Sequence, residues 1–262
     1  MAAGRANATE PADDLPTEAS EPVARFDNPA GLSPIFLICE HASNHLPARH
    51  GDLGLSGAER ESHIAWDPGA LDVALGLARR LDAPLARATV SRLVLDLNRE
   101  PSAPDSITTL SERTAVPGNA GLPEAERQRR VREVYDAFHR EVERFMHERS
   151  APTRAVVSIH SFTPVYRDVA RPWHVGLIFD RDRRMADAVG EALARDPSIA
   201  VGLNEPYSPA DRVFHTLDRH AVRRGLAPLM IEIRNDLIRT PGEADGWAER
   251  LAPLLRGALG RL

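Results

Sequence analysis

The distribution of apolar residues along the chain predicts six short strands, because brief runs rich in β-branched residues recur between polar segments. These runs are Ile35–Cys39, Pro84–Ala88, Leu93–Leu97, Ala155–Ile159, Val175–Phe179 and Leu229–Ile233. Most of them lack a clean alternation of apolar and polar positions, which is typical of strands covered on both faces. The pattern therefore predicts a sheet with further structure on each side.

Helical periodicity occupies the segments between these runs. The predicted helices are Gly69–Leu81, Glu124–Arg149, Arg184–Arg195, Leu217–Arg224 and Glu243–Leu262. The longest carries a single apolar stripe, formed by Val131, Val134, Tyr135, Phe138, Val142, Phe145 and Met146. His139 and His147 fall outside that stripe, so we expect both imidazoles to be solvated. Alternating strands and helices predict an α/β domain with a largely parallel sheet.

The chain divides into a tail and one globular part. Residues 1–30 contain six acidic residues against two arginines, with Ala and Pro and few apolar residues, and this composition predicts a disordered acidic N-terminal tail. We expect residues 31–262 to form a single domain. Within it, residues 101–123 are polar and lack periodicity, which is typical of an active-site lid or a disordered loop.

Composition excludes several classes of chemistry. The single cysteine, Cys39, rules out an intramolecular disulfide framework and a Cys-rich metal site. All 33 basic residues are arginine, which excludes a Schiff-base lysine and the lysine of a P-loop. A net charge of −5 argues against a nucleic-acid partner. With neither a membrane-spanning run nor a secretory signal, we expect a cytoplasmic protein without a membrane partner, and the sequence leaves its oligomeric state open.

Polar residues cluster where four of the predicted strands end. They are Glu40, His41, Asp96, Asn98, Arg99, His160, Glu232 and Arg234. Ligands of open α/β sheets bind at the carboxyl ends of strands, so we expect these side chains to converge. Two imidazoles with a carboxylate or amide are a ligand set that suits Zn²⁺ with one position open for water. The sequence thus predicts a hydrolytic metal site, although strand-end polar residues can also simply cap neighbouring helices.

Six strings occur in an order that resembles the N-formylglutamate amidohydrolase family, from about residue 35 to 255. They are CEHASNHLP (39–47), HIAWDPG (63–69), SRLVLDLNR (91–99), SIHSF (158–162), NEPYSP (204–209) and MIEIRNDLI (230–238). The DLNR string and the late glutamate are also similar to the zinc carboxypeptidase and aspartoacylase group. The resemblance implies a three-layer α/β/α fold with a mixed, largely parallel central sheet. It also implies a single amidohydrolase domain and a role in histidine degradation.

The resemblance assigns metal ligands, with Zn²⁺ expected and another divalent metal as the alternative. His41 and His160 match the first and last metal histidines of the wider group. Asn44 stands where that group has a ligand glutamate, and an amide oxygen binds Zn²⁺ less well than a carboxylate. We therefore expect Asp67 to be the middle ligand, although Asp before Pro also fits a helix N-cap. Glu40 is the third candidate.

Glu232 is the predicted general base, because an unpaired carboxylate within an apolar strand would otherwise be costly. The alternative is that it pairs with Arg234, which alternation places on the same face of the strand.

Several further residues are expected to bind substrate. Arg99 and Arg234 could each hold a substrate carboxylate through the planar guanidinium fork, and Asn98 would add a directional hydrogen bond. Arg92 is expected either to hold a carboxylate or to stabilise the oxyanion. Tyr207 fits a hydroxyl near the site and an ordinary loop tyrosine equally well.

The expected reaction is metal-dependent hydrolysis of an N-formyl or small N-acyl amide of an acidic amino acid, with N-formylglutamate giving glutamate and formate. The first alternative is a carboxypeptidase-like or deacylase activity on a peptide or cell-wall fragment. The second is a non-catalytic binding protein on the same scaffold, in which Asn44 would mark a lost metal. The number of arginines in the pocket should help to separate the two activities, because a dicarboxylate product needs two separate clamps.

Overall fold

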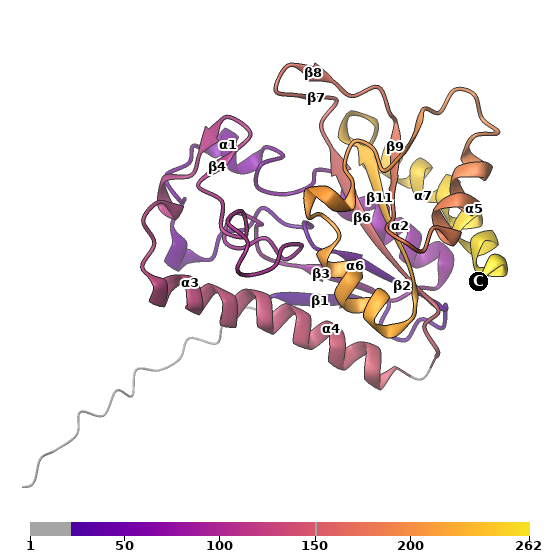
Figure 1. Cartoon of the computed structure of the whole chain (residues 1–262), viewed down its shortest axis with the longest axis horizontal. Helices are drawn as coiled ribbons and strands as arrows, with labels where there is room; N and C mark the ends of the chain where they lie inside the picture. Colours follow the sequence, from indigo (N-terminus) through magenta and orange to yellow (C-terminus); the bar gives the residue numbers. More distant parts are fainter. Residues whose placement is uncertain (1–21, 150) are drawn as a thin grey trace, which may run out of the picture.

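A computed structural model describes residues 22–149 and 151–262 (Figure 1). Its centre is a seven-stranded sheet in the spatial order β1-β3-β2-β6-β11-β9-β10. In chain order these strands are β1 (Ala24–Asp27), β2 (Ile35–Cys39), β3 (Leu85–Ala88), β6 (Ala155–Phe162), β9 (Val175–Ile178), β10 (Val201–Leu203) and β11 (Ala227–Arg234). Strands β3, β2, β6 and β11 run parallel, whereas β1 is antiparallel to β3 and β9 to β11. The predicted mixed, largely parallel sheet is confirmed.

The continuous apolar strands are explained by the two cores that the sheet separates. In β2, Ile35, Leu37 and Cys39 belong to the core on one face, whereas Phe36 and Ile38 belong to the core on the other. Successive side chains of a strand point to opposite faces, so a strand with a core on each side needs an apolar residue at every position. This is why β2 and β6 are buried along their whole length.

Helices cover both faces of the sheet, which confirms the three-layer α/β/α architecture. One face packs against α2 (Ala70–Leu81), α5 (Arg184–Leu193) and α7 (Pro241–Ala258). The other packs against α4 (Ala137–Glu148) and α6 (His215–His220). Helix α3 (Glu124–Arg130) continues through a π-helical segment, Val131–Asp136, into α4, and together they run along the lower edge of the view in Figure 1. The short α1 (Gly57–Glu61) lies among the loops.

The prediction that Leu93–Leu97 forms a strand is wrong, although its apolar side chains are buried as expected. The backbone turns here, and its carbonyl groups are bound by side chains rather than by a neighbouring strand. Asn119 donates to the carbonyl oxygen of Leu93 at 2.8 Å, Arg130 to that of Val94 at 3.0 Å, and His139 bonds that of Leu97 at 3.1 Å. A buried apolar run fits either structure, because the pattern does not reveal the partners of the backbone.

The expected disordered tail is partly wrong, because β1 begins at Ala24 and pairs along its whole length with β3. Residues 1–21 of that tail lie outside the described residues. The segment predicted to be a long loop, residues 101–123, contains a small hairpin of β4 (Leu110–Ser111) and β5 (Thr114–Ala115). A second hairpin joins β7 (Val165–Tyr166) to β8 (Val169–Ala170). In the described part of the chain, no helix is both long and apolar enough to cross a bilayer.

Candidate functional site

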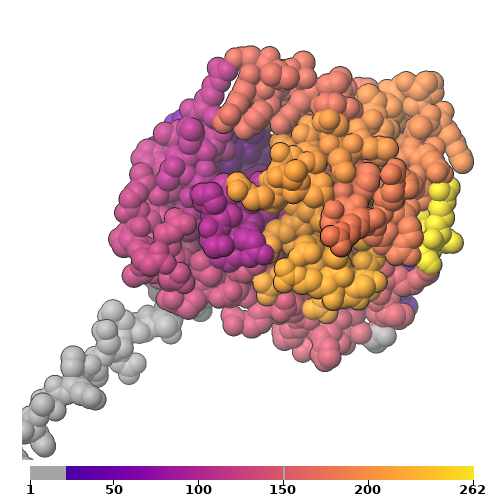
Figure 2. All heavy atoms as spheres, in the orientation of Figure 1, coloured from indigo at the N-terminus to yellow at the C-terminus, as the bar shows by residue number. Residues whose placement is uncertain are grey.

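A cavity of about 630 Å³ opens at the carboxyl ends of β2, β6 and β11. Figure 2 shows this side of the molecule hollowed between the magenta and orange parts of the chain, beneath the β7–β8 hairpin. The β4–β5 hairpin and the β7–β8 hairpin both contribute to its walls. Its charged and hydrogen-bonding lining includes His41, Asp67, Arg92, Asp96, Asn98, Arg99, His160, Arg171, Tyr207 and Glu232.

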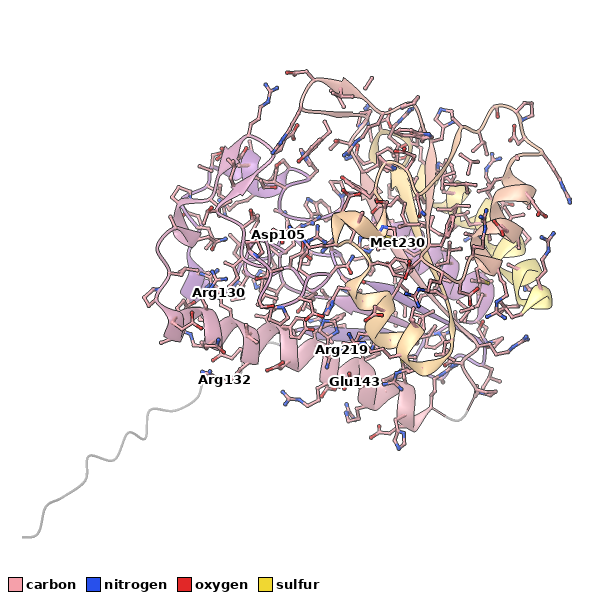
Figure 3. All side chains as sticks on the ribbon, viewed as in Figure 1. Asp105, Arg130, Arg132, Glu143, Arg219 and Met230 are labelled. Atoms are coloured by element: carbon pink, nitrogen blue, oxygen red, sulfur yellow. The ribbon has the colours of Figure 1, made fainter. Side chains whose placement is uncertain are left out.

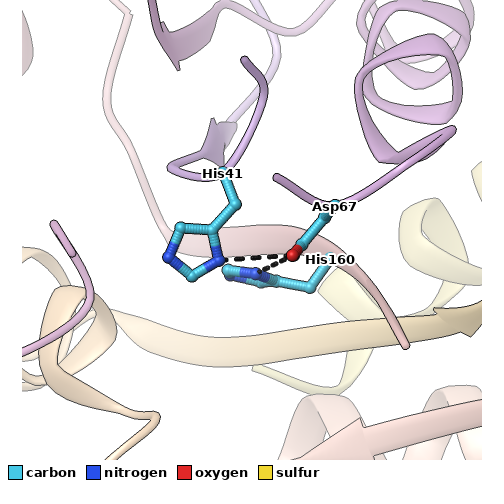
Figure 4. Close-up of side chains that lie close together, drawn as sticks. All are labelled: His41, Asp67 and His160. Carbon is cyan, nitrogen blue, oxygen red and sulfur yellow. Dashed lines mark hydrogen bonds and ion pairs between the residues drawn. The ribbon is translucent and has the colours of Figure 1, made fainter. Parts of the chain in front are cut away.

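Three predicted ligands meet at the floor of this cavity, where each of them is buried (Figure 4). Asp67 Oδ2 lies 2.8 Å from His160 Nδ1 and 3.3 Å from His41 Nδ1. One ligand atom from each residue can be chosen so that all lie within 4.8 Å of one another. His41 comes two residues after the end of β2, and His160 lies within the neighbouring strand β6. Two imidazole nitrogens and a carboxylate oxygen are a donor set that could hold a metal ion.

The backbone around Gly69 determines where Asp67 points. Gly69 adopts φ +79° and is itself the N-cap of α2, so the N-cap alternative for Asp67 is wrong. A Cβ atom on Gly69 would lie 2.3 Å from the carbonyl oxygen of Ile238, so only glycine allows this close approach of the two segments. With the turn in this conformation, the Asp67 carboxylate points toward the two histidines.

The ring nitrogens that face away from Asp67 have carboxylate partners. His41 Nε2 lies 2.8 Å from Asp96 Oδ1, and His160 Nε2 lies 3.1 Å from Glu40 Oε2. Histidines that bind metals commonly donate their other N–H to a carboxylate, which fixes the ring and leaves the facing nitrogen as a lone-pair donor. The His41–Asp96 contact is a hydrogen bond of this kind, whereas His160 and Glu40 form a close ion pair without hydrogen-bond geometry. Each imidazole thus has an acidic neighbour behind the nitrogen that faces away from Asp67.

The charges at the floor of the cavity favour a cation. Four carboxylates are buried there, on Glu40, Asp67, Asp96 and Glu232, and Arg92 is the guanidinium in contact with two of them. Burial opposes protonation of His160, yet the nearby carboxylates of Glu40 and Asp67 raise its pKa well above the usual value. Burial and Arg92 likewise oppose protonation of His41, yet Asp96 and Asp67 raise its pKa. The carboxylates thus attract positive charge to the position between the rings.

Glu232 lies beside His160, because the two residues are paired in the register of β11 and β6. Its Oε2 atom is buried and has no hydrogen-bond partner among the described residues. Burial raises the pKa of Glu232 to about 7. The alternative pairing with Arg234 is wrong, since Arg234 donates to Asp236 at 2.7 Å. Glu232 is therefore a buried carboxylate that lines the cavity without a hydrogen-bond partner for Oε2.

Arg92 and Tyr207 also reach the cavity. Arg92 donates to Asp67 Oδ1 at 3.2 Å and to Asp96 Oδ2 at 2.8 Å, which places its guanidinium against the floor. Tyr207 is partly buried against the core, and burial raises the pKa of its hydroxyl to about 12, so it is not an ordinary surface tyrosine.

The remaining predicted substrate residues have partners within the protein. Asn98 lines the cavity, but its side-chain amide donates to the carbonyl oxygen of Val213 and accepts from the backbone N–H of Thr216. Arg99 also lines the cavity and is paired with Asp105 at 3.1 Å. Arg234 is not part of the cavity lining. The structure therefore brings Asn98 and Arg99 to the site but does not bring Arg234 there.

Asn44 and Glu40, the other two candidates for the middle ligand, do not lie between the rings of His41 and His160. The side chain of Asn44 donates to the carbonyl oxygen of Arg60, and Glu40 lies behind His160. Sequence reasoning gave no role to Asp96, although it belongs to the DLNR string. It also missed Arg171, which carries no motif that would single it out.

A model of the N-formylglutamate amidohydrolase family matches residues 33–239. The chain belongs to the N-formylglutamate amidohydrolase family. The resemblance found in the six strings is thereby confirmed, and it makes the chain a member of a family of amide hydrolases. No curated protein matches the chain significantly.

Two solved structures extend this likeness to the N-formylglutamate amidohydrolase fold. The gene product Atu2144 from Agrobacterium tumefaciens is 43% identical, with a TM-score of 0.88 over 93% of this chain and 97% of that one. The N-formylglutamate amidohydrolase from Ralstonia eutropha JMP134 is 21% identical, with a TM-score of 0.58 over 92% of this chain and 98% of that one. The second likeness is one of fold.

Proposed function

We propose that this protein is a zinc-dependent hydrolase of N-formyl or small N-acyl amides of acidic amino acids, with N-formylglutamate as the expected substrate. The observation that carries the proposal is the arrangement of His41 and His160. Each directs one ring nitrogen toward Asp67 and the other toward a buried carboxylate. A non-catalytic binding protein has no need for this arrangement beside an unpaired Glu232.

The three ligands fit Zn²⁺, because they supply two nitrogen atoms and one oxygen atom and leave the cavity side open. A divalent cation held there would polarise the scissile carbonyl and acidify a water molecule. Glu232 would take the proton of the attacking water and return it to the leaving nitrogen. Arg92, which Asp67 and Asp96 hold against the floor, would stabilise the negative charge that develops on the carbonyl oxygen.

The test is the Glu232→Gln variant, which keeps the size of the side chain and removes the base. Turnover of N-formylglutamate should fall by at least about 100-fold, with bound zinc unchanged when it is measured by elemental analysis. Glu191→Gln, in an exposed pair with Arg261, is the control for loss of a carboxylate and should keep full activity. Near-normal turnover in Glu232→Gln would remove Glu232 from the mechanism.

A substrate panel separates the proposed activity from its alternatives. We expect the wild-type protein to favour N-formyl and N-acetyl amino acids over peptides, with glutamate and aspartate preferred. Preferred release of residues from peptides would instead support the carboxypeptidase-like activity. A purified protein that takes up no zinc after reconstitution would support the binding protein.

A further inference from the structure

Arg171 extends into the cavity just after β8, and its guanidinium lies among three aromatic rings. The Cζ atom is 4.6 Å from the ring centroid of Tyr166, 4.8 Å from that of Tyr207 and 5.8 Å from that of Phe162. The residue is only 9% exposed. Such ring contacts attract a cation and hold its plane in place, but they leave its N–H groups free for other partners.

Arg171 is buried in the cavity wall and lacks the carboxylate partner that Arg92 and Arg99 have. Arg92 is paired with Asp67 and Asp96, and Arg99 is paired with Asp105. Arg167 also lines the cavity, but it lies exposed on the turn of the β7–β8 hairpin, where its side chain donates to the carbonyl oxygen of Glu112. Among residues 22–149 and 151–262, Arg171 forms no ion pair. Its side chain makes one hydrogen bond there, from Nη1 to the Tyr207 hydroxyl at 3.1 Å.

A buried guanidinium without a counter-ion is unfavourable, because burial removes water and nothing negative replaces it. The ring contacts offset part of this cost and do not neutralise the charge. The Nε and Nη2 atoms of Arg171 have no hydrogen-bond partner within the described residues, and Arg171 lines the cavity. An anion in the cavity would therefore find a fixed guanidinium with unused donors.

We propose that Arg171, together with Tyr207, binds a carboxylate group of the substrate. The guanidinium fork matches a carboxylate in a bidentate manner. The Tyr207 hydroxyl accepts from Arg171, so its own proton is available to donate to the same carboxylate. Arg171 thereby replaces Arg99 and Arg234 as the main carboxylate clamp, since those two already have acidic partners. The inference rests on the proposed function for the identity of the substrate, and it adds a residue that recognises one of the two carboxylates of that substrate.

The test compares the dicarboxylate substrate with its two monoamides, each of which keeps one carboxylate, in the full-length, zinc-loaded protein. We expect Arg171→Gln to lower kcat/KM for N-formylglutamate by at least about 10-fold. N-formylglutamine lacks the γ-carboxylate and N-formylisoglutamine lacks the α-carboxylate. For the one that lacks the carboxylate bound by Arg171, the same change should alter kcat/KM by less than about 3-fold. Arg132→Gln removes an exposed arginine that is not part of the cavity lining (labelled in Figure 3) and should change neither value. An equal loss for the acid and for both amides would overturn the proposal.

Two further variants guard against a general loss of structure in Arg171→Gln. Arg171→Lys keeps the charge without the fork and should recover part of the preference for the acid. Tyr207→Phe keeps the ring beneath the guanidinium and removes only the hydroxyl, so it should lower kcat/KM for the acid by a smaller factor. If both variants keep the wild-type preference for the acid, Arg171 does not recognise the carboxylate.

Calorimetric binding of L-glutamate separates this inference from the proposed function, because it needs no turnover. We expect wild type and Arg132→Gln to bind L-glutamate alike, and Arg171→Gln to bind it at least about 10-fold more weakly. If Arg171→Gln loses this binding but the wild-type protein hydrolyses no amide, the proposed role of Arg171 is supported and the proposed function is wrong. If the wild-type protein is active and Arg171→Gln binds L-glutamate as tightly as wild type does, only the proposed role of Arg171 is wrong.

Discussion

His139 Nδ1 lies 2.8 Å from His220 Nε2, between α4 and α6, and both side chains are completely buried. The expectation that His139 is solvated is therefore wrong. Its Nε2 faces the carbonyl oxygen of Leu97 at 3.1 Å, so this nitrogen carries the proton and Nδ1 accepts from His220. Nearby, Arg219 of α6 pairs with Glu143 of α4 at 2.9 Å (Figure 3). The histidine pair holds the chain next to Asp96 and Asn98 in place.

The histidine pair should make the fold sensitive to acid. Burial lowers the pKa of His220 to about 3, and burial together with His220 lowers that of His139 well below its usual value. The unfolded chain takes up these protons near pH 6.5, whereas the folded protein stays neutral there. Stability should therefore be full above about pH 6.5 and fall as the pH is lowered toward 3.

His220→Gln removes one of these titrating groups and keeps a side-chain amide that can donate to His139. In urea unfolding between pH 6 and pH 4, the slope of unfolding free energy against pH should decrease by up to about 1.4 kcal/mol per pH unit. His147→Gln, exposed on α4, is the control for loss of a histidine. A slope that is identical in His220→Gln and wild type would show that His220 is protonated in the folded protein.

Asp67→Asn should weaken zinc binding far more than Asn44→Ala does. Asp67 lies between the two histidine rings, whereas the Asn44 side chain bonds the carbonyl oxygen of Arg60. Competition with a chelator measures the zinc affinity of both variants. The reverse order of effects would return the middle ligand to the position three residues after His41.

Asp96→Asn and Glu40→Gln should each lower zinc affinity by about 10–100-fold, although neither carboxylate belongs to the ligand set. Each change removes the negative charge that orients a ligand histidine, His41 or His160. Asp187→Asn, in an exposed pair with Arg183 on α5, is the control in the same chelator assay. Unchanged affinity in both buried variants would mean that other contacts orient the rings.

Gly69→Ala and Gly246→Ala should change stability in opposite directions. Gly69 has φ +79° and lies against the carbonyl oxygen of Ile238, so a methyl group there should cost about 1–3 kcal/mol. Gly246 is exposed within α7 with open space around it, and alanine there should add about 0.5–1 kcal/mol. Thermal unfolding compares the two variants directly. Stabilisation by Gly69→Ala would contradict the close approach that positions Asp67.

Much of the fold and the core of the site could be predicted, because both depend on signals that are local in sequence. The apolar runs at Ile35–Cys39 and Ala155–Ile159 form central strands of the sheet, and His41 and His160 come directly after or close behind these runs. The order of the strands brings those two ends together, so the convergence followed from the topology of a parallel sheet.

The rest depends on contacts between residues that are distant in the chain. Leu93–Leu97 has the composition of a strand, but side chains from residues 119, 130 and 139 bind its carbonyl groups. His139 is polar by sequence and is buried because His220 supplies its partner. Arg171 is one of 33 basic residues, and only its surrounding rings and its missing counter-ion distinguish it. No local pattern encodes such partners.

The short strand β1 has a consequence for how this chain behaves when it is shortened. It covers the outer side of β3, and Arg87 of β3 pairs with Asp27 of β1 at 2.7 Å. A chain that started at residue 31, where composition places the boundary of the domain, would leave the N–H and C=O groups of β3 open to another molecule. We expect such a chain to self-associate through β3, whereas one that starts at residue 22 stays dispersed.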